Sequence, residues 1–121
     1  MIEKRLGQVE LSFAEIIWEH APLSSAELVR LCAQELSWKK STTYTVLKKL
    51  CDRGLFENDG GTVRVRMTRE QYDSAQSALF VNAAFAGSLP AFVAAFTAGK
   101  PLSAQEADEI RRMIDAFREE R

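Results

Sequence analysis

The clearest structural signal in this chain is the segment KKSTTYTVLKKLCDRG, which runs from Lys39 to Gly54. On a helical wheel, the residues suited to a protein core gather on one face: Thr43, Val46, Leu47, Leu50 and Cys51. The opposite face carries Ser41, Thr45, Lys48, Lys49 and Asp52, with Thr42 and Tyr44 at its edges. Hydroxyl and ammonium groups bond DNA phosphates, and hydroxyl groups also reach base edges. The segment is therefore typical of a helix that packs on a core and touches DNA.

Two more helices are predicted upstream of this segment. Residues 6–20 carry apolar side chains at helical spacing, namely Val9, Phe13, Ile16 and Ile17, and Ala21-Pro22 ends that helix. Ser24-Ser25-Ala26-Glu27 is a capping box, in which a serine and a glutamate close the start of a helix. We expect the helix that follows to turn four side chains inward: Leu28, Leu31, Cys32 and Leu36.

Downstream of Gly54, the sequence changes to strand patterning. Residues 55–58 read as one strand, Asp59-Gly60-Gly61 is turn chemistry, and residues 62–68 alternate strictly. In the second strand, Val63, Val65 and Met67 share one face, and Arg64 and Arg66 share the other. We interpret the hairpin as a wing whose arginines face DNA. The alternative is a solvated edge strand whose charges oppose aggregation.

The distribution of charge supports a nucleic-acid partner, although the 121-residue chain has a net charge of only −1. Residues 37–72 hold eight basic and four acidic side chains, which gives +4. Residues 1–36 hold three basic and six acidic side chains, which gives −3, and residues 73–121 hold five basic and seven acidic side chains, which gives −2. The positive charge thus falls on the predicted recognition helix and wing, as expected for an electrostatic footprint on DNA.

The pattern becomes helical again after Thr68. Three helices are predicted, at about residues 68–86, 88–98 and 103–117, with caps at Thr68, Ser88 and Ser103. Roughly 50 residues form an independent core with difficulty, yet this region is rich in large apolar side chains. These are Leu79, Phe80, Phe85, Leu89, Phe92, Phe96, Ile110, Ile114 and Phe117.

We expect these side chains to be buried against a second copy of the chain, which would make the protein a homodimer. The alternative is packing onto the winged-helix domain of the same chain. The expected fold is mostly α with a small β-hairpin. It comprises a winged helix-turn-helix domain over residues 1–69 and a three-helix dimerisation region over residues 70–121.

Several other classes of protein are disfavoured. A hydrophobic content of 46% argues against disorder. No apolar run reaches the length of a membrane span and no signal peptide is visible, so a cytoplasmic location is expected. His20 is the only histidine, so a zinc site would lack ligands, and since His20 stands at the end of a predicted helix, no Ser-His-Asp arrangement is credible. We therefore expect no enzymatic activity, no metal and no cofactor.

The ordered set of motifs resembles the penicillinase-repressor family of bacterial winged-helix transcriptional regulators. The matching segments are residues 6–11, 16–19, 26–28, 41–50 and 53–55, then residues 85–89 and an acidic final helix. The resemblance implies a repressor that binds a palindromic operator as a homodimer. In many members, a membrane-bound sensor metalloprotease relieves repression by causing cleavage within the C-terminal helices. In a copper-responsive branch, metal acts through C-terminal cysteine pairs, which this chain lacks.

The resemblance also points to individual residues. The Asn-Phe pair cleaved in the family appears here as Ala95-Phe96, so the inducing signal stays open. On the DNA side, we expect Ser41, Thr42, Tyr44 and Thr45 near base edges or adjacent phosphates. We expect phosphates to be contacted by Lys40, Lys48, Lys49, Arg64 and Arg66. The alternative function is a winged-helix protein-interaction module without DNA affinity.

Overall fold

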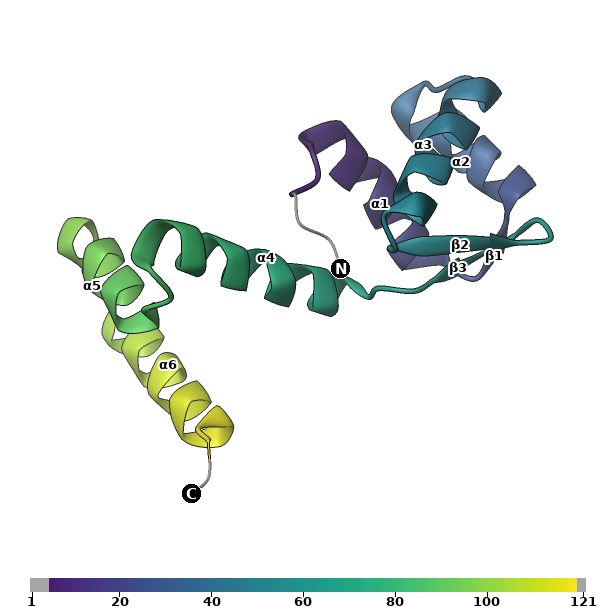
Figure 1. The fold of residues 1–121 in the computed structure, drawn as a ribbon. Coiled ribbons are helices and arrows are strands. Elements are labelled where there is room, and N and C mark those ends of the chain that lie inside the picture. Colours follow the sequence, from purple (N-terminus) through teal and green to yellow (C-terminus); the bar gives the residue numbers. More distant parts are fainter. Residues whose placement is uncertain (1–4, 120–121) are drawn as a thin grey trace. The chain divides into compact units, whose positions relative to one another are not determined.

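The computed structural model describes residues 5–119, and most of these are helical (Figure 1). The elements are α1 (Gln8–His20), β1 (Leu23–Ser24), α2 (Ser25–Leu36), α3 (Lys40–Asp52), β2 (Phe56–Asp59), β3 (Thr62–Val65), α4 (Arg69–Phe85), α5 (Leu89–Gly99) and α6 (Ala104–Phe117). This order confirms the predicted class, a winged helix followed by three helices. The chain divides into two compact units, and the division between Leu79 and Phe80 falls inside α4.

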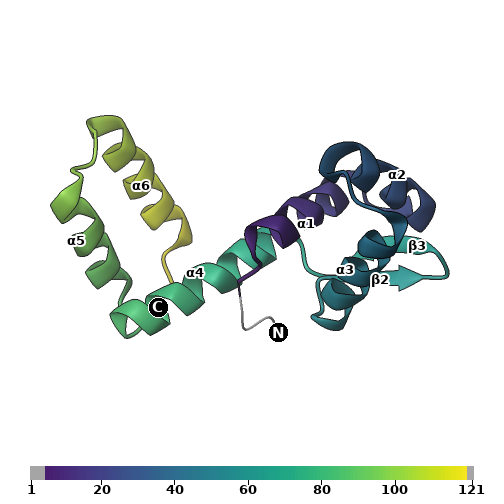
Figure 2. The same ribbon diagram turned by 90° about the horizontal axis from the view of Figure 1, so that it is seen from above.

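The first unit is a winged-helix domain with one apolar core. Every helix and the sheet contribute to this core, and its largest fully buried side chains include Phe13, Ile17, Leu28, Leu50, Phe56 and Val63. Figure 2 shows α3 running beside the β2–β3 hairpin, with α1 and α2 on its other sides. The outward face of α3 is therefore free to meet another molecule.

The sheet has three antiparallel strands in the order β1-β3-β2, one more than the predicted hairpin. Leu23 and Ser24 of β1 lie opposite Val63 and Thr62 of β3. A two-residue strand is too short to show alternation, so only its partner reveals it. At the hairpin turn, Gly60 and Gly61 have φ angles of +58° and +91°, which glycine adopts without steric cost.

The predicted helix caps are confirmed. Ser24 Oγ accepts a hydrogen bond from the Glu27 N–H at 3.0 Å. At the start of α4, Thr68 and Gln71 bond each other's backbone N–H through their side chains, a reciprocal capping box. Ser103 and Glu106 form a capping box of the same kind at α6. At α5 the cap is one-sided, since Ser88 Oγ accepts from the Ala91 N–H at 3.1 Å.

The start of α1 differs from the prediction. The helix begins at Gln8, and Val9 is exposed instead of facing the core. Leu6, which precedes the helix, is the buried apolar residue at this end. Helical periodicity places Val9 on the apolar face of α1, but the first turn of that face extends beyond the core. Leu6, just before the helix, packs into the core at this end instead.

The first turn of α4 is fastened to α1. The Tyr72 side chain is 4% exposed, and its hydroxyl accepts a hydrogen bond from the Leu6 N–H at 2.7 Å. The Trp18 indole packs against Tyr72 and donates to the Met67 carbonyl at 2.9 Å. The Arg69 guanidinium lies 5.4 Å from the Trp18 ring centroid and pairs with Glu15 at 2.9 Å. The start of α4 therefore belongs to the winged-helix unit.

The second unit lacks a buried interior. In the single chain, no residue of α5 or α6 is buried. Phe80, Phe85, Phe92 and Phe96 form a cluster of rings whose neighbouring centroids are 5.6–6.2 Å apart. Within residues 5–119, no single helix is long and apolar enough to cross a membrane. Helices α4 and α5 together have the length and composition of a membrane span, but they are bent by 81° at the break between them.

We predict that Tyr72→Phe destabilises the protein. The substitution leaves the buried Leu6 N–H without an acceptor, which costs about 1–3 kcal/mol in the free energy of unfolding. Urea unfolding at one fixed protein concentration measures this loss. Tyr44→Phe is the matched control, since its hydroxyl is only part-buried. Equal stabilities for the two variants would contradict the anchoring role of Tyr72.

Candidate nucleic-acid interface

The outward face of α3 collects the side chains expected to touch DNA. Lys40, Ser41, Thr42, Thr45, Lys48 and Lys49 are all exposed. On the inward face, Thr43, Leu47 and Leu50 are buried. The predicted division of this helix into a core face and a polar face is thus confirmed, and it follows from the 3.6-residue period of the helix.

Tyr44 lies at the edge between these two faces and is half-buried. Its hydroxyl donates to Ser25 Oγ, the first residue of α2, at 3.1 Å. With Lys48 and Asn58, among others, Tyr44 lines an open hollow of about 390 Å³ between α3 and β2. Tyr44 therefore joins α3 to α2 and β2 while leaving part of its ring accessible.

The lysines of α3 differ in their partners. Lys40 forms no ion pair with any residue from 5 to 119, whereas Lys48 Nζ lies 3.2 Å from Asp52 Oδ2 one turn further along the helix. Lys49 Nζ lies 2.5 Å from Glu10 Oε2 on α1. The ammonium group of Lys49 is thus directed toward α1, and its charge is already neutralised in the free protein.

Glu10 holds this pair together as a carboxylate. The hydrogen bond from Lys49 lowers the pKa of the Glu10 carboxyl, partial burial acts in the opposite direction, and a bond from the Gly7 N–H adds to the lowering. A carboxyl with a lowered pKa stays charged at neutral pH and loses its contribution to stability only as the pH falls through that lowered value. The Glu10 carboxylate therefore stays ionised and compensates the positive charge of Lys49 throughout the neutral pH range.

The wing adds two more cations, Arg64 on β3 and Arg66 directly after it, because the strand ends at Val65, before the predicted end at residue 68. Arg64 and Arg66 are both exposed, as the alternation predicted. Arg66 lies 3.6 Å from Glu57 on β2, an exposed pair of little energetic weight. Arg64 forms no ion pair within residues 5–119. Arg64 is therefore the wing cation with the least competition for a phosphate.

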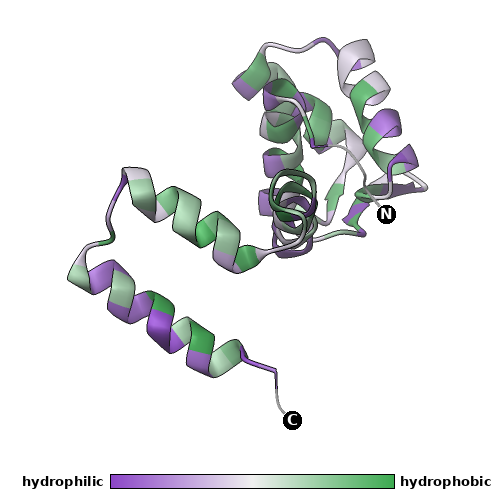
Figure 3. Ribbon diagram, turned by 60° about the vertical axis from the view of Figure 1, so that its left-hand side comes forward, coloured by the Kyte–Doolittle hydropathy of each residue, from purple (hydrophilic) through white to green (hydrophobic). Residues whose placement is uncertain are grey.

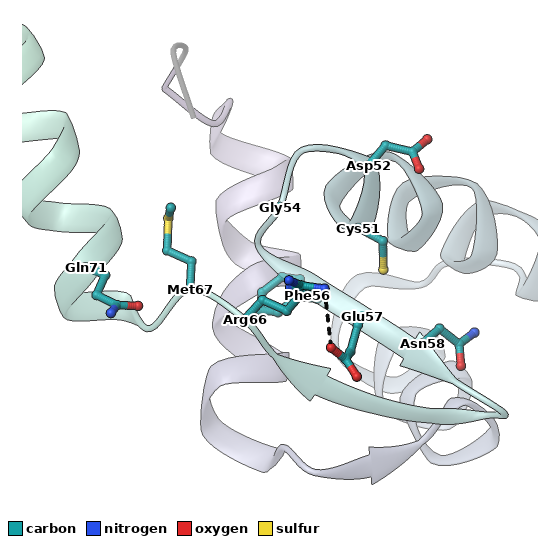
Figure 4. A pocket seen from close by; sticks show the side chains of 9 residues that line it. All are labelled: Cys51, Asp52, Gly54, Phe56, Glu57, Asn58, Arg66, Met67 and Gln71. Carbon is teal, nitrogen blue, oxygen red and sulfur yellow. Dashed lines mark ion pairs between the residues drawn. The ribbon is translucent and has the colours of Figure 1, made fainter. Parts of the chain in front are cut away.

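A second open hollow, of about 700 Å³, lies between the end of α3, β2 and the start of α4 (Figure 4). Burial raises the pKa of the Cys51 thiol there, and the nearby charges of Asp52 and Glu57 raise it further. A thiol with a raised pKa stays protonated and is a weak nucleophile. The hollow, as far as residues 5–119 line it, therefore has no activated nucleophile.

Sequence reasoning missed three residues at this surface. Lys39 precedes α3 and is exposed beside Lys40. Ser25 and Asn58 reach the edge of α3 from α2 and β2. The lysine run was a usable signal for Lys39. No sequence signal existed for the other two, because tertiary packing alone brings them to Tyr44.

We predict that Lys40→Ala and Lys49→Ala change the salt dependence of duplex DNA binding by different amounts. Loss of a phosphate contact at Lys40 should lower the slope of log K against log salt by about 0.9. Lys49→Ala should lower it less, since Glu10 already neutralises that ammonium. Fluorescence anisotropy titrations of a labelled duplex at several salt concentrations measure both slopes.

Lys49→Ala also removes the nearer of the two cations paired with Glu10 and leaves only Arg53, 3.8 Å from its other carboxylate oxygen, so the less compensated carboxylate would repel DNA and weaken binding. The double variant Glu10→Gln/Lys49→Ala removes this complication and serves as the control. Equal slope changes for the Lys40 and Lys49 variants would show that the Glu10 pair opens completely on DNA.

Two comparisons with known proteins match most of the chain, one to a family model and one to a single protein of similar length. The sequence model of the family described as penicillinase repressor matches residues 6–116, which include all of α1 to α5 and most of α6. A protein named penicillinase repressor, from Bacillus licheniformis, is 24% identical over 115 residues. That alignment covers 92% of this chain and 90% of the relative, so the similarity extends over both units.

Proposed function

This chain belongs to the penicillinase repressor family, and we propose that it represses transcription by binding a palindromic operator as a homodimer through α3 and the β2–β3 wing. The observation that carries the proposal is the exposed face of α3, where hydroxyls and lysines lie together beside a wing with two exposed arginines, Arg64 and Arg66. A repressor of this kind needs no catalytic residues. It acts by occupying DNA.

In this proposal, α3 enters the major groove, which is wide enough to admit a helix. Ser41, Thr42 and Thr45 then lie nearest the base edges. The Thr45 hydroxyl donates to the Ser41 carbonyl at 2.9 Å, so its oxygen is left to accept from a base amino group. Tyr44 takes the edge of the helix.

Phosphates flank the groove, and the proposal assigns them to cations around α3 and on the wing. Lys40 and Lys48 reach the backbone beside the helix, with Lys49 contributing if its pair with Glu10 opens. Arg64 and Arg66 reach it from the wing. Contacts of this type supply affinity and register, whereas the hydroxyls supply sequence preference.

The apolar surface of the second unit supports the homodimer. The large apolar side chains of α6, which form its apolar stripe, are exposed, with Ile114 at 59% and Phe117 at 85%. In Figure 3, hydrophobic segments (green) recur between hydrophilic ones along this last helix before the C-terminus. Isolated soluble chains rarely leave so many large apolar side chains in water. A two-fold axis would place this stripe against its own copy, and the same symmetry would present two recognition helices to a palindrome.

The predicted dimerisation residues do not all have the same surroundings. Phe85 and Phe92 are half-buried within the ring cluster of their own chain, and Phe92 contacts three other rings. Leu79, Phe80, Leu89, Phe96, Ile110, Ile114 and Phe117 are exposed. A charge at Phe92 would therefore damage the unit itself, so a test of the dimer is better placed on α6.

We predict that the wild-type protein selects a palindrome from random-sequence duplex DNA and binds it as a dimer. Ile114→Glu should place a charge in the proposed interface, yield monomers in sedimentation and weaken binding to the selected palindrome. Each half-site bound alone keeps only its own contacts, so affinity falls steeply when the two halves separate.

Gln105→Glu is the matched control, since it adds the same charge at an exposed residue of α6 outside the apolar stripe. It should dimerise and bind DNA like the wild type. Failure of the wild type to enrich any duplex would contradict the proposal and favour an interaction module. If the wild-type protein sediments as a monomer at micromolar concentration, the proposed homodimer is contradicted.

We also propose that repression is relieved by cleavage at Ala95-Phe96 in α5, with a membrane-bound sensor metalloprotease as the partner. Both residues are exposed, so a protease can reach them once the helix opens locally. A cut there would separate α6 and its apolar stripe from the winged-helix unit. The dimer would then lose much of its proposed contact surface.

Mass spectrometry of the protein from induced cells tests this switch. We predict two fragments that meet at Ala95-Phe96, together with transcription of the target genes. Intact chains in cells that transcribe those genes would contradict proteolytic relief.

A further inference from the structure

We propose that Ser25 is a positioning residue for DNA recognition, which fixes the Tyr44 side chain of α3 relative to the wing. This inference rests on the proposed function, because it concerns how the α3 surface is held ready for DNA. Ser25 itself need not touch a base. Its effect would pass through Tyr44.

Ser25 is the point at which three elements of the winged-helix unit meet. It is the first residue of α2, and its Oγ accepts a hydrogen bond from Tyr44 Oη at 3.1 Å. Its backbone N–H donates to the carbonyl of Gly61, in the turn of the wing, at 2.8 Å. One residue thereby joins the second helix, the recognition helix and the wing.

The wing side of this junction does not involve the side chain of Ser25. Ser24, next to Ser25, lies opposite Thr62 in the β1–β3 pairing, and the turn is closed by a bond from the Gly61 N–H to Asn58 Oδ1 at 3.1 Å. These contacts survive a change of the Ser25 side chain. The hydroxyl of Ser25 is thus the one part of the junction that ties Tyr44 to it.

The tie matters because Tyr44 is half-buried at the edge of the exposed face of α3. A ring with a fixed hydroxyl is held in one orientation before DNA arrives. A ring without this bond must be ordered during binding, which subtracts from affinity. The junction is also near the surface, so its loss has a small effect on overall stability.

A double-mutant cycle isolates this role. Using the duplex selected by the wild type, we expect Ser25→Ala to weaken binding about two- to tenfold, the range of one net hydrogen bond. In a Tyr44→Phe background, Ser25→Ala should have no further effect, because the hydroxyl it positions is already absent. Ser25→Thr keeps the hydroxyl and should restore wild-type affinity. Thermal unfolding of each variant identifies any that is simply unstable.

Thr45→Ala supplies the control cycle. Its hydroxyl bonds only the Ser41 carbonyl in its own helix, so its effect should add to that of Ser25→Ala. The positioning role is overturned if Ser25→Ala binds like the wild type, or if it weakens binding equally with and without the Tyr44 hydroxyl. Failure of the wild type to select any duplex is a separate result, which overturns the proposed function.

Discussion

Leu47 and Leu50 hold α3 in the core of the winged-helix unit, and what the helix presents to solvent follows from their burial. Each fully buried leucine contributes about 1.5–3 kcal/mol by the removal of apolar area from water. With Thr43, they fix the rotation of the helix about its axis. Because this rotation is fixed, the opposite face of α3, with Ser41, Thr45 and Lys48, is turned to solvent. The core therefore determines the recognition surface.

Electrostatics refine this surface after packing has placed it. The region from residue 37 to 72 carries a net +4 after Asp52 and Glu57 are subtracted, but its cations Lys49 and Arg69 are also paired with Glu10 and Glu15 from outside the region. Lys40 and Arg64, at the start of α3 and on the wing, have no such partner within residues 5–119. Charge counted along a sequence thus overstates what a phosphate meets, and the unpaired cations indicate where the DNA backbone would run.

Sequence predicted the features whose causes are local. The two faces of α3, the serine cap at Ser24, the capping box at Thr68 and the alternation of Arg64 with Val63 and Val65 all arise from spacing along a few residues. The predicted box at Ser24 forms only in part, since the Glu27 carboxylate bonds Arg30 instead. The missed features join distant segments. The Tyr72 hydroxyl meets the Leu6 N–H across 66 residues, which brings the start of α4 into the winged-helix unit. Likewise β1, the Glu10–Lys49 pair and the Ser25–Tyr44 bond exist only once the chain has folded.

Hydroxyl-radical and guanine-methylation footprinting on the selected duplex is the most direct test that α3 reads DNA as part of a dimer. Two recognition helices in the major groove should protect guanine N7 at two places about 34–36 Å apart, on one side of the duplex. Thr45→Ala should change protection at those bases and leave the phosphate protection near the wing intact. Protection confined to the minor groove, or a single protected half-site bound by one chain, would contradict this arrangement.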